Sequence, residues 1–322
     1  MKRSVCIIIC IYCALPFILF DVFLYTHFIK RLQNPFGKEM QAKSIVLEDY
    51  LPFEDKSKIV KLKASDEYCF KPDEKMPVLD GATALYPVYS AFFNAMYPEG
   101  TCFFNGTDFT EKSLLQKRNT GGAYKAIVNG TADIIFCAEP SEKQLEYAAQ
   151  NNVELVQIPI GFEAFVFLVN KNNPVDSLTI DQIRAIYSGK LRSWSEVGGD
   201  NSKISAITRP DGSGSQTAML SFMNGQKIKP ANSIYAGRTL GYSFRYYVEG
   251  IVASQNIKLL ALNGVAPTKE NIRNHTYPIV SNFYAIYRAS DSERADIQKV
   301  ISFILSADGQ RIVEESSYVS LN

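Results

Sequence analysis

An alternation of apolar and polar patterns between residues 132 and 158 constrains the fold of this chain most strongly. Residues 132–137 form a short, nearly continuous apolar run, which is typical of a strand buried on both faces. Residues 141–152 have the apolar spacing of a helix, and residues 153–158 follow as a second strand. Strand, helix and strand in this order predict an α/β architecture.

Two β-rich runs, residues 162–170 and 279–288, flank a middle set of elements. That middle set extends from a predicted helix at 180–188 to an apolar run at 259–262. After the second β-rich run, the pattern predicts one amphipathic helix at 292–305 and a short tail. A chain that leaves one lobe and later returns to it places a middle lobe between two crossover strands.

The 322 residues are enough for two lobes with separate cores. We expect lobe 1 to comprise residues 76–160 together with 279–322, and lobe 2 to comprise residues 161–278. The tail from Gly309 onward is too short to form a lobe, so we expect it to dock on lobe 1. Residues 31–75 are mixed and charged, which indicates a tether or an irregular lead-in.

The N-terminus predicts a membrane anchor. Residues 4–29 are almost wholly apolar apart from Asp21 and His27, and this length can cross a bilayer as a helix. No small-residue cleavage site follows, so an uncleaved signal-anchor over residues 1–30 is favoured over a removed export signal. We therefore expect a single-pass protein of the cell membrane whose soluble part lies on the extracytoplasmic face.

Charge and reactive side chains exclude several function classes. The 34 basic and 33 acidic residues nearly cancel, so no overall field indicates a nucleic-acid partner. Two histidines, and cysteines without metal-ligand spacing, leave no material for a metal site, and we expect no cofactor. Beyond the membrane segment, a Cys69–Cys102 bridge and buried free thiols are both compatible with the sequence, and Cys137 is left over.

A glycine-serine turn at residues 209–219 carries the clearest chemical signal. Two glycines bracket Ser213. After Ser215, which is placed like an N-cap, apolar residues recur with the spacing of a helix. Free N–H groups and the positive end of a helix dipole would then face the turn, and Arg209 adds a fork of donors. This pattern predicts an anion site, with an ordinary capped loop as the alternative. It is no nucleotide P-loop, because no lysine follows the last glycine.

Several ordered motifs resemble the phosphate-binding protein of the bacterial ABC phosphate transporter and its membrane-tethered relatives. The resemblance covers about residues 76–320. It rests on the Asp-Gly-Ala-Thr-Ala-Leu-Tyr-Pro segment at 80–87, Asn-Thr-Gly-Gly at 119–122, Ile-Tyr-Ser-Gly-Lys at 186–190, the turn at 209–215, and the segments at 241–247 and 263–268. So many matching segments in the same order make chance agreement implausible.

The resemblance implies a two-lobed type II periplasmic-binding-protein fold with a hinge of two crossover strands. It also implies that phosphate, or a related oxyanion, is held between the lobes and delivered to ABC permease subunits in the membrane. Three loops would hold the anion, and their residues in this chain are Thr83, Ala84, Asn119, Thr120, Arg209, Ser213, Gly214 and Ser215. Thr83 could alternatively serve as an N-cap for the helix that begins near Leu85.

Two departures from the family pattern stand out. Ala138 occupies the position at which the family has an aspartate that accepts a hydrogen bond from protonated phosphate, and Glu139 follows it. Glu139 either reaches into the site and restores the acceptor, or points to solvent. The stretch from 224 to 240 is shorter than in the family by roughly twenty residues.

Three functions follow from these observations. The first is an extracytoplasmic solute receptor for an ABC permease. The second is a membrane-tethered sensor or interaction module that keeps the fold but has altered or lost phosphate binding. The third, a hydrolase that uses Ser213 or Ser215, lacks a Gly-x-Ser-x-Gly elbow, and His275 has no evident acidic partner. We therefore expect no catalytic residue.

Overall fold

The protein is represented by a computed structural model, which describes residues 45–211, 213–229 and 238–322. The predicted anchor at residues 1–30 lies outside the described residues, as does the first part of the lead-in. Within the described ranges, no helix combines the length and apolar character needed to cross a membrane.

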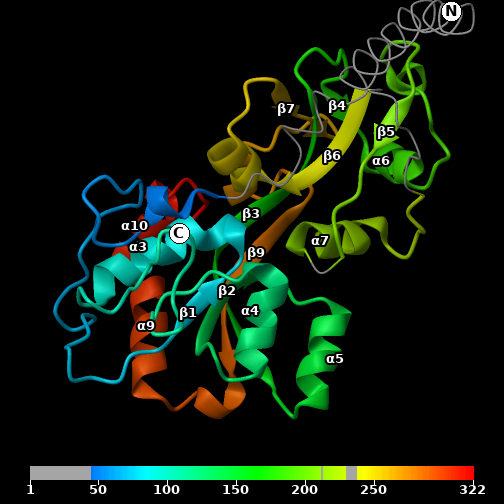
Figure 1. Cartoon of the computed structure of the whole chain (residues 1–322). Coiled ribbons are helices and arrows are strands. Elements are labelled where there is room, and N and C mark those ends of the chain that lie inside the picture. Colours follow the sequence, from blue (N-terminus) through cyan, green and yellow to red (C-terminus); the bar gives the residue numbers. More distant parts are fainter. Residues whose placement is uncertain (1–44, 212, 230–237) are drawn as a thin grey trace, which may run out of the picture.

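A mixed sheet runs through both ends of the described structure (Figure 1). Its hydrogen-bonded order is β1-β2-β9-β3-β6-β5, and β7 also pairs with β3. The strands are β1 Leu79–Gly81, β2 Ile134–Ala138, β3 Leu155–Asn170, β5 Ile204–Ala206, β6 Arg238–Phe244, β7 Ile257–Leu259 and β9 Val280–Arg288. β1 pairs with β2, and β5 with β6, in parallel, whereas β9 is antiparallel to both β2 and β3. The short strands β4 Ser177–Leu178 and β8 Ala261–Leu262 pair separately.

The helices cover both ends of this sheet. They are α3 Tyr86–Met96, α4 Asn119–Val128, α5 Glu142–Gln150, α6 Ile180–Tyr187, α7 Gly214–Met223, α8 Lys269–Arg273, α9 Ala295–Leu305 and α10 Ala307–Glu315. The helices predicted at 141–152, 180–188 and 292–305 are confirmed as α5, α6 and α9, and the helix expected to begin near Leu85 is α3. The succession of strand, helix and strand predicted between residues 132 and 158 is confirmed as β2, α5 and β3.

β3 differs from the prediction, because one continuous strand replaces two. It bends where its register against β9 shifts, between Pro159 and Gly161. In sequence these two residues look like a break between strands, but the pairing with β9 continues on both sides of them. Gly161 is required at the bend, since a Cβ there would stand 2.6 Å from the Phe283 ring and 2.9 Å from the Val319 carbonyl oxygen.

The buried apolar side chains separate into groups at the two ends of β3. We call the first core the clusters built on α3, α4, α9, α10, β1 and β2, and the second core the cluster built on α6, α7, β6, β8 and the later half of β3. Apart from Val319, the buried members of the second core lie between Ala164 and Tyr277. The first core takes its residues from both ends of the described chain and, in addition, from Tyr246, Tyr247, Ile251 and Val252.

The described part of the lead-in is irregular but packed. Ile45, Leu47 and Phe70 are buried in the first core. The Phe70 amide donates to the Met96 carbonyl at 2.8 Å, which fixes the segment against the end of α3. From residue 45 onward the segment is thus an irregular lead-in rather than a free tether.

The C-terminal segment also differs, because a second helix, α10, follows α9 where a short tail was expected. Ser306 ends α9 and caps α10, its hydroxyl accepting from the Gly309 amide at 3.2 Å. A Cβ on Gly309 would stand 2.1 Å from the Phe303 carbonyl oxygen, so glycine allows the two helices to meet at this sharp turn. Ile312 and Val313 then pack into the first core.

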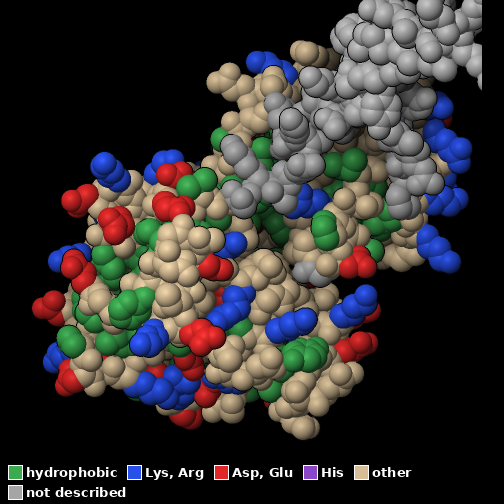
Figure 2. All heavy atoms as spheres, in the orientation of Figure 1, with side chains coloured by type: hydrophobic (Ala, Val, Ile, Leu, Met, Phe, Trp, Pro, Cys, Tyr) green, Lys and Arg blue, Asp and Glu red, His purple; other side chains and the backbone are tan. Residues whose placement is uncertain are grey.

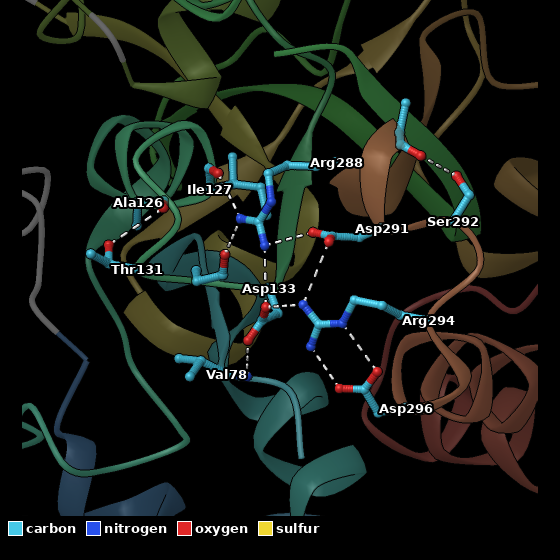
Figure 3. Close-up of polar contacts among 12 residues, drawn as sticks. Val78, Ala126, Ile127, Thr131, Asp133, Arg288, Asp291, Ser292, Arg294 and Asp296 are labelled. Carbon is cyan, nitrogen blue, oxygen red and sulfur yellow. Dashed lines mark hydrogen bonds and ion pairs between the residues drawn. The ribbon is translucent and has the colours of Figure 1, made fainter. Parts of the chain in front are cut away.

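An ion-pair network fastens β9 to the elements beside it (Figure 3). Asp133 accepts from Arg288 at 3.2 Å and from Arg294 at 2.6 Å, and Arg294 also contacts Asp296 at 2.6 Å. Arg288 further donates to the carbonyl oxygens of Ile127 and Ala132 at 2.9 and 2.7 Å. The network therefore gives a hydrogen-bond donor to a carbonyl group in the last turn of α4 and holds the start of α9 in place.

The thiols of Cys69, Cys102 and Cys137 are free. Of the two alternatives left by the sequence, the Cys69–Cys102 bridge is therefore not formed. Cys137 is fully buried in β2, and burial raises the pKa of its thiol well above the ordinary value.

Candidate functional site

The turn at 209–219 leads into α7, which begins at Gly214. Its N-cap is Ser213, whose hydroxyl accepts from the Gln216 amide at 3.2 Å. The prediction that Ser215 is the cap was wrong by two residues, because Gly214 and Ser215 already belong to the helix. A cap oxygen bonds the amide of the third helical residue, and that residue is Gln216.

Gly214 is where the two cores come together. A Cβ on this residue would stand 3.5 Å from the Thr120 hydroxyl oxygen, 3.6 Å from the Phe244 ring and 3.8 Å from the Ala138 methyl group. Thr120 and Ala138 lie on elements of the first core, and Phe244 lies with Gly214 on elements of the second. The start of α4, the end of β2 and the start of α7 therefore meet at one point, next to β6.

Two helix N-termini face this point. α4 begins at Asn119 and α7 at Gly214. Each supplies backbone N–H groups and the positive end of a helix dipole, a combination that favours an anion. Within the described ranges, no acceptor bonds the Gly214 or Ser215 amide.

The position of Arg209 is fixed by hydrogen bonds of its backbone amide, so its guanidinium group is left to bind a ligand. Its amide donates to the Gln216 side-chain oxygen at 3.1 Å and to the Tyr242 hydroxyl at 3.0 Å. The Tyr242 hydroxyl in turn donates to Gln216. The guanidinium carbon lies 5.7 Å from the Tyr247 ring centroid, within cation–π range. Its buried Nε has no hydrogen-bond partner among the described residues. Because an unpaired buried donor is costly, this nitrogen favours an incoming acceptor.

In the second loop, the side chain of Asn119 makes a hydrogen bond within the loop itself. Asn119 has a φ of 61° and its side-chain oxygen accepts from the Gly122 amide at 3.1 Å. Its amide nitrogen stays available as a donor. Thr120 is half-buried, and its hydroxyl is the nearest polar group to Gly214 across the junction of the two cores.

The first loop follows β1, with Thr83 and Ala84 in a short 3-10 turn before α3. The capping alternative for Thr83 is not what the structure shows, since no side chain caps either this turn or α3. The Ala82 amide donates to the Phe136 carbonyl oxygen at 2.8 Å, and β1 pairs with β2 in parallel. The loop therefore leaves the same sheet edge at which β2 ends in Ala138.

The end of β2 presents a methyl group, not a carboxylate, to Gly214. The Ala138 carbonyl accepts from the Tyr124 hydroxyl at 2.7 Å, and the residue is half-buried. Glu139 is exposed and makes no hydrogen bond or ion pair with the described residues. Of the predicted site residues, the structure thus brings Thr120 and Gly214 together and leaves Glu139 at the surface.

Sequence reasoning missed four residues that shape the site. Gln216 and Tyr242 hold the Arg209 loop, and Asp80 bonds Arg118 between the first two loops. Gln216 had a signal in the sequence, because it stands at the third helical position after the cap. The others become neighbours only through tertiary packing.

The face shown in Figure 2 carries acidic and basic side chains interspersed over the first core, the lower part of that view. This mixture agrees with the near balance of 34 basic and 33 acidic residues in the chain. Attraction of an anion would thus come from the local donors of the site rather than from a broad positive field.

Comparison with known proteins places this geometry in a family. Residues 77–308 match the family model of the PBP superfamily domain. The phosphate-binding protein PstS of Borreliella burgdorferi is 22% identical over 271 residues, covering 77% of this chain and 91% of that protein. PstS of Staphylococcus aureus strain USA300 is 26% identical over 220 residues, covering 62% of this chain and 67% of that protein.

Among solved structures, the ABC-type phosphate transport receptor of Vibrio cholerae is similar in fold. The TM-score is 0.54 at 20% identity, covering 75% of this chain and 98% of the other. At this identity the likeness concerns the fold alone, which is α/β and periplasmic-binding-protein-like. The family match spans well over half of the 322 residues, and the chain therefore belongs to the PBP superfamily.

Proposed function

We propose that this protein is an extracytoplasmic solute-binding protein that captures inorganic phosphate, or a related tetrahedral oxyanion, and delivers it to an ABC permease. The names of its relatives support this function. The Borreliella and Staphylococcus proteins are phosphate-binding proteins, and the Vibrio protein is a phosphate transport receptor.

The observation that carries the proposal is the meeting of Thr120, Ala138 and Gly214. The N-termini of α4 and α7 converge there from different cores. A tetrahedral oxyanion needs many donors around it, and two helix ends with hydroxyl side chains supply them from both sides. Arg209, whose Nε lacks a partner among the described residues, supplies the charge.

The ligand set that we propose comes from three loops. In the first, the Thr83 hydroxyl and the Ala84 amide donate, and in the second, Asn119 and Thr120 donate. The third contributes Arg209, Ser213, Gly214 and Ser215. The Ser213 hydroxyl can act here and still cap α7, because its oxygen accepts from Gln216 while its proton stays free to donate.

In this proposal the two cores correspond to the two lobes for most residues, whereas Tyr246, Tyr247, Ile251, Val252 and Val319 pack in the core of the opposite lobe. Lobe 1 comprises residues 76–160 and 279–322, and lobe 2 comprises residues 161–278. β3 and β9 would form the hinge of a type II arrangement, because both strands continue past the point where the first core gives way to the second. Hinge closure would bury the anion and exclude water.

We also propose that residues 4–29 anchor the protein in the cell membrane as a single-pass helix, with the lobes on the extracytoplasmic face. The apolar length of the segment supports this placement. An anchored receptor would stay close to the permease subunits that it serves.

Equilibrium dialysis of the detergent-solubilised full chain against labelled phosphate, with sulfate as competitor, tests the function. We expect micromolar binding that weakens about 100-fold in Arg209→Ala, the scale of a lost charge-assisted contact. Arg311→Ala, which removes an exposed partner of Glu315, is the matched control and should bind as the wild type does. Failure of the wild-type chain to bind any oxyanion would overturn the proposal.

A second function, a tethered sensor with altered or lost phosphate binding, is favoured by the end of β2. Phosphate near neutral pH carries a proton that needs an acceptor, whereas Ala138 faces the site with a methyl group and Glu139 is exposed. Sulfate has no proton to donate. Equal competition by sulfate, or the absence of phosphate binding, would therefore favour the sensor over the transport receptor.

A further inference from the structure

One buried carboxylate, that of Asp80, joins the first two ligand loops. The side chain is completely buried at the end of β1. One of its oxygens accepts from the Gly81 amide at 2.8 Å and from the Arg118 amide at 2.9 Å. The other accepts from the Arg118 guanidinium at 2.7 Å. A single side chain thus bonds the backbone of both loops.

The contact on the first loop is fixed by its surroundings. A Cβ on Gly81 would stand 2.6 Å from the Phe136 carbonyl oxygen and 2.8 Å from the Tyr89 ring, so the backbone lies directly against the core. Gly81 is bonded by Asp80, and the next residue, Ala82, is bonded by β2. Thr83 follows at once, so its position depends on this anchored dipeptide.

The contact on the second loop lies one residue before the start of α4. The Arg118 amide is bonded by Asp80, and Asn119 then turns the chain with a φ of 61°. Thr120, which faces Gly214, comes next. A shift at Arg118 would therefore be transmitted over two residues to the hydroxyl at the junction of the two cores.

The charge of Arg118 gives the pair a second role. Burial raises the pKa of Asp80, while the guanidinium of Arg118 acts in the opposite direction and favours the ionised form. The Arg118 side chain is 36% exposed and therefore keeps contact with solvent. An uncompensated carboxylate beside two anion-binding loops would repel the ligand, and Arg118 cancels that charge.

We propose that Asp80 is a positioning residue of the anion site, which sets the spacing between the Thr83 and Thr120 loops, and that Arg118 neutralises it so that an anion can approach. This inference rests on the proposed function, because it assigns roles within the same site.

The test compares phosphate binding by full-length variants in detergent. Asp80→Asn keeps an oxygen for both amides and removes the negative charge, so phosphate should bind as well as to wild type or several-fold more tightly. Asp80→Ala removes both backbone contacts, and its Kd should rise at least 10-fold at temperatures at which circular dichroism shows a folded protein. Asp80→Leu, which fills the site without an acceptor, should bind as weakly as Asp80→Ala, a result that loss of packing alone would not give.

A double-mutant cycle over Asp80 and Arg118 tests the role of the arginine. It does not use Asp80→Ala, so a folding defect in that variant does not affect it. Arg118→Ala leaves the carboxylate uncompensated, so phosphate binding should weaken about 10-fold or more at low ionic strength and less at high salt. Adding Asp80→Asn to Arg118→Ala should restore most of the lost affinity. Equal binding by all variants, or failure of asparagine to rescue, overturns this inference while leaving the proposed function intact. If wild type binds neither phosphate nor sulfate, the proposed function fails, and this inference fails with it.

Discussion

The hydroxyl oxygen of Thr120 lies 3.5 Å from the point that a Cβ on Gly214 would occupy, although the two residues belong to different cores. This is ordinary van der Waals separation, so a methyl group would fit without strain. It would, however, occupy the space between the two helix N-termini. A substitution at Gly214 can therefore change ligand binding without reducing the stability of the fold.

Gly214→Ala should weaken phosphate binding by about 10-fold or more without loss of stability. The added methyl displaces the anion, whereas replacing glycine in a compatible helical conformation typically stabilises a protein by about 0.4–1 kcal/mol. Calorimetric titration and thermal unfolding measure the two effects on the same sample. Leu220→Ala, at an exposed position on the same helix, is the control. A variant that binds normally would exclude Gly214 from the site.

Ser213→Asp should retain the helix and lose the ligand. Aspartate is as good an N-cap as serine, so the free energy of unfolding should stay within about 0.5 kcal/mol of wild type. Its negative charge beside the site repels an oxyanion, and phosphate binding should fall to background. Ser213→Ala should instead cost about 1 kcal/mol of stability. Retained binding in Ser213→Asp, measured by dialysis, would show that Ser213 only caps α7.

Glu163→Gln should flatten the dependence of stability on pH. Glu163 is buried near the bend in β3, where it accepts from the Ala164 and Tyr246 amides at 2.9 and 3.2 Å. Burial raises the pKa of this carboxyl from 4.5 to about 7, against the opposing effect of Arg245. The folded state thus holds a proton that the unfolded state releases.

The stabilisation that the folded state gains from the proton on Glu163 is fully present below pH 4.5 and is lost as the pH rises through about 7. The shift corresponds to roughly 3 kcal/mol. Urea unfolding at pH 5, 6, 7 and 8 should show wild-type stability falling relative to Glu163→Gln by an amount of this order. Parallel curves for the two proteins would contradict the assignment.

Asp133→Asn should destabilise the first core without altering the site. The side chain is 18% exposed and accepts from Arg288, Arg294 and the Val78 amide. Removing its charge takes one carboxylate partner from each guanidinium, while Arg288 keeps Asp291 and Arg294 keeps Asp296. The cost should therefore be about 1–2 kcal/mol after allowance for partial exposure. Asp181→Asn, whose side chain is 96% exposed, should cost almost nothing. Phosphate affinity well below the unfolding midpoint should be unchanged in both variants.

The sequence patterns predicted most of the secondary structure because apolar spacing reports burial directly. The helix at 141–152 and the buried strand at 132–137 are examples. The pattern failed where tertiary contacts override local signals. Pro159 and Gly161 look like a strand break, yet pairing with β9 continues across them. Gly309 disfavours a helix locally, yet α10 forms because that glycine fits against the end of α9.

The candidate site was only partly readable from sequence. The turn before α7 was predicted because turn chemistry is local, although the cap was placed at Ser215 and the structure has it at Ser213. The roles of Asp80 and Tyr242 were not found, since each acts through a residue that is distant in the chain. The exposure of Glu139 likewise depends on packing that spacing does not reveal.

The segment that follows α10 links the two cores. Tyr318 packs in the first core, Val319 packs in the second, and the Val319 backbone pairs with Phe162 at the bend of β3. One short segment therefore contributes side chains to both cores, and its backbone is bonded to β3 between them. A substitution that loosens this segment should destabilise both cores together.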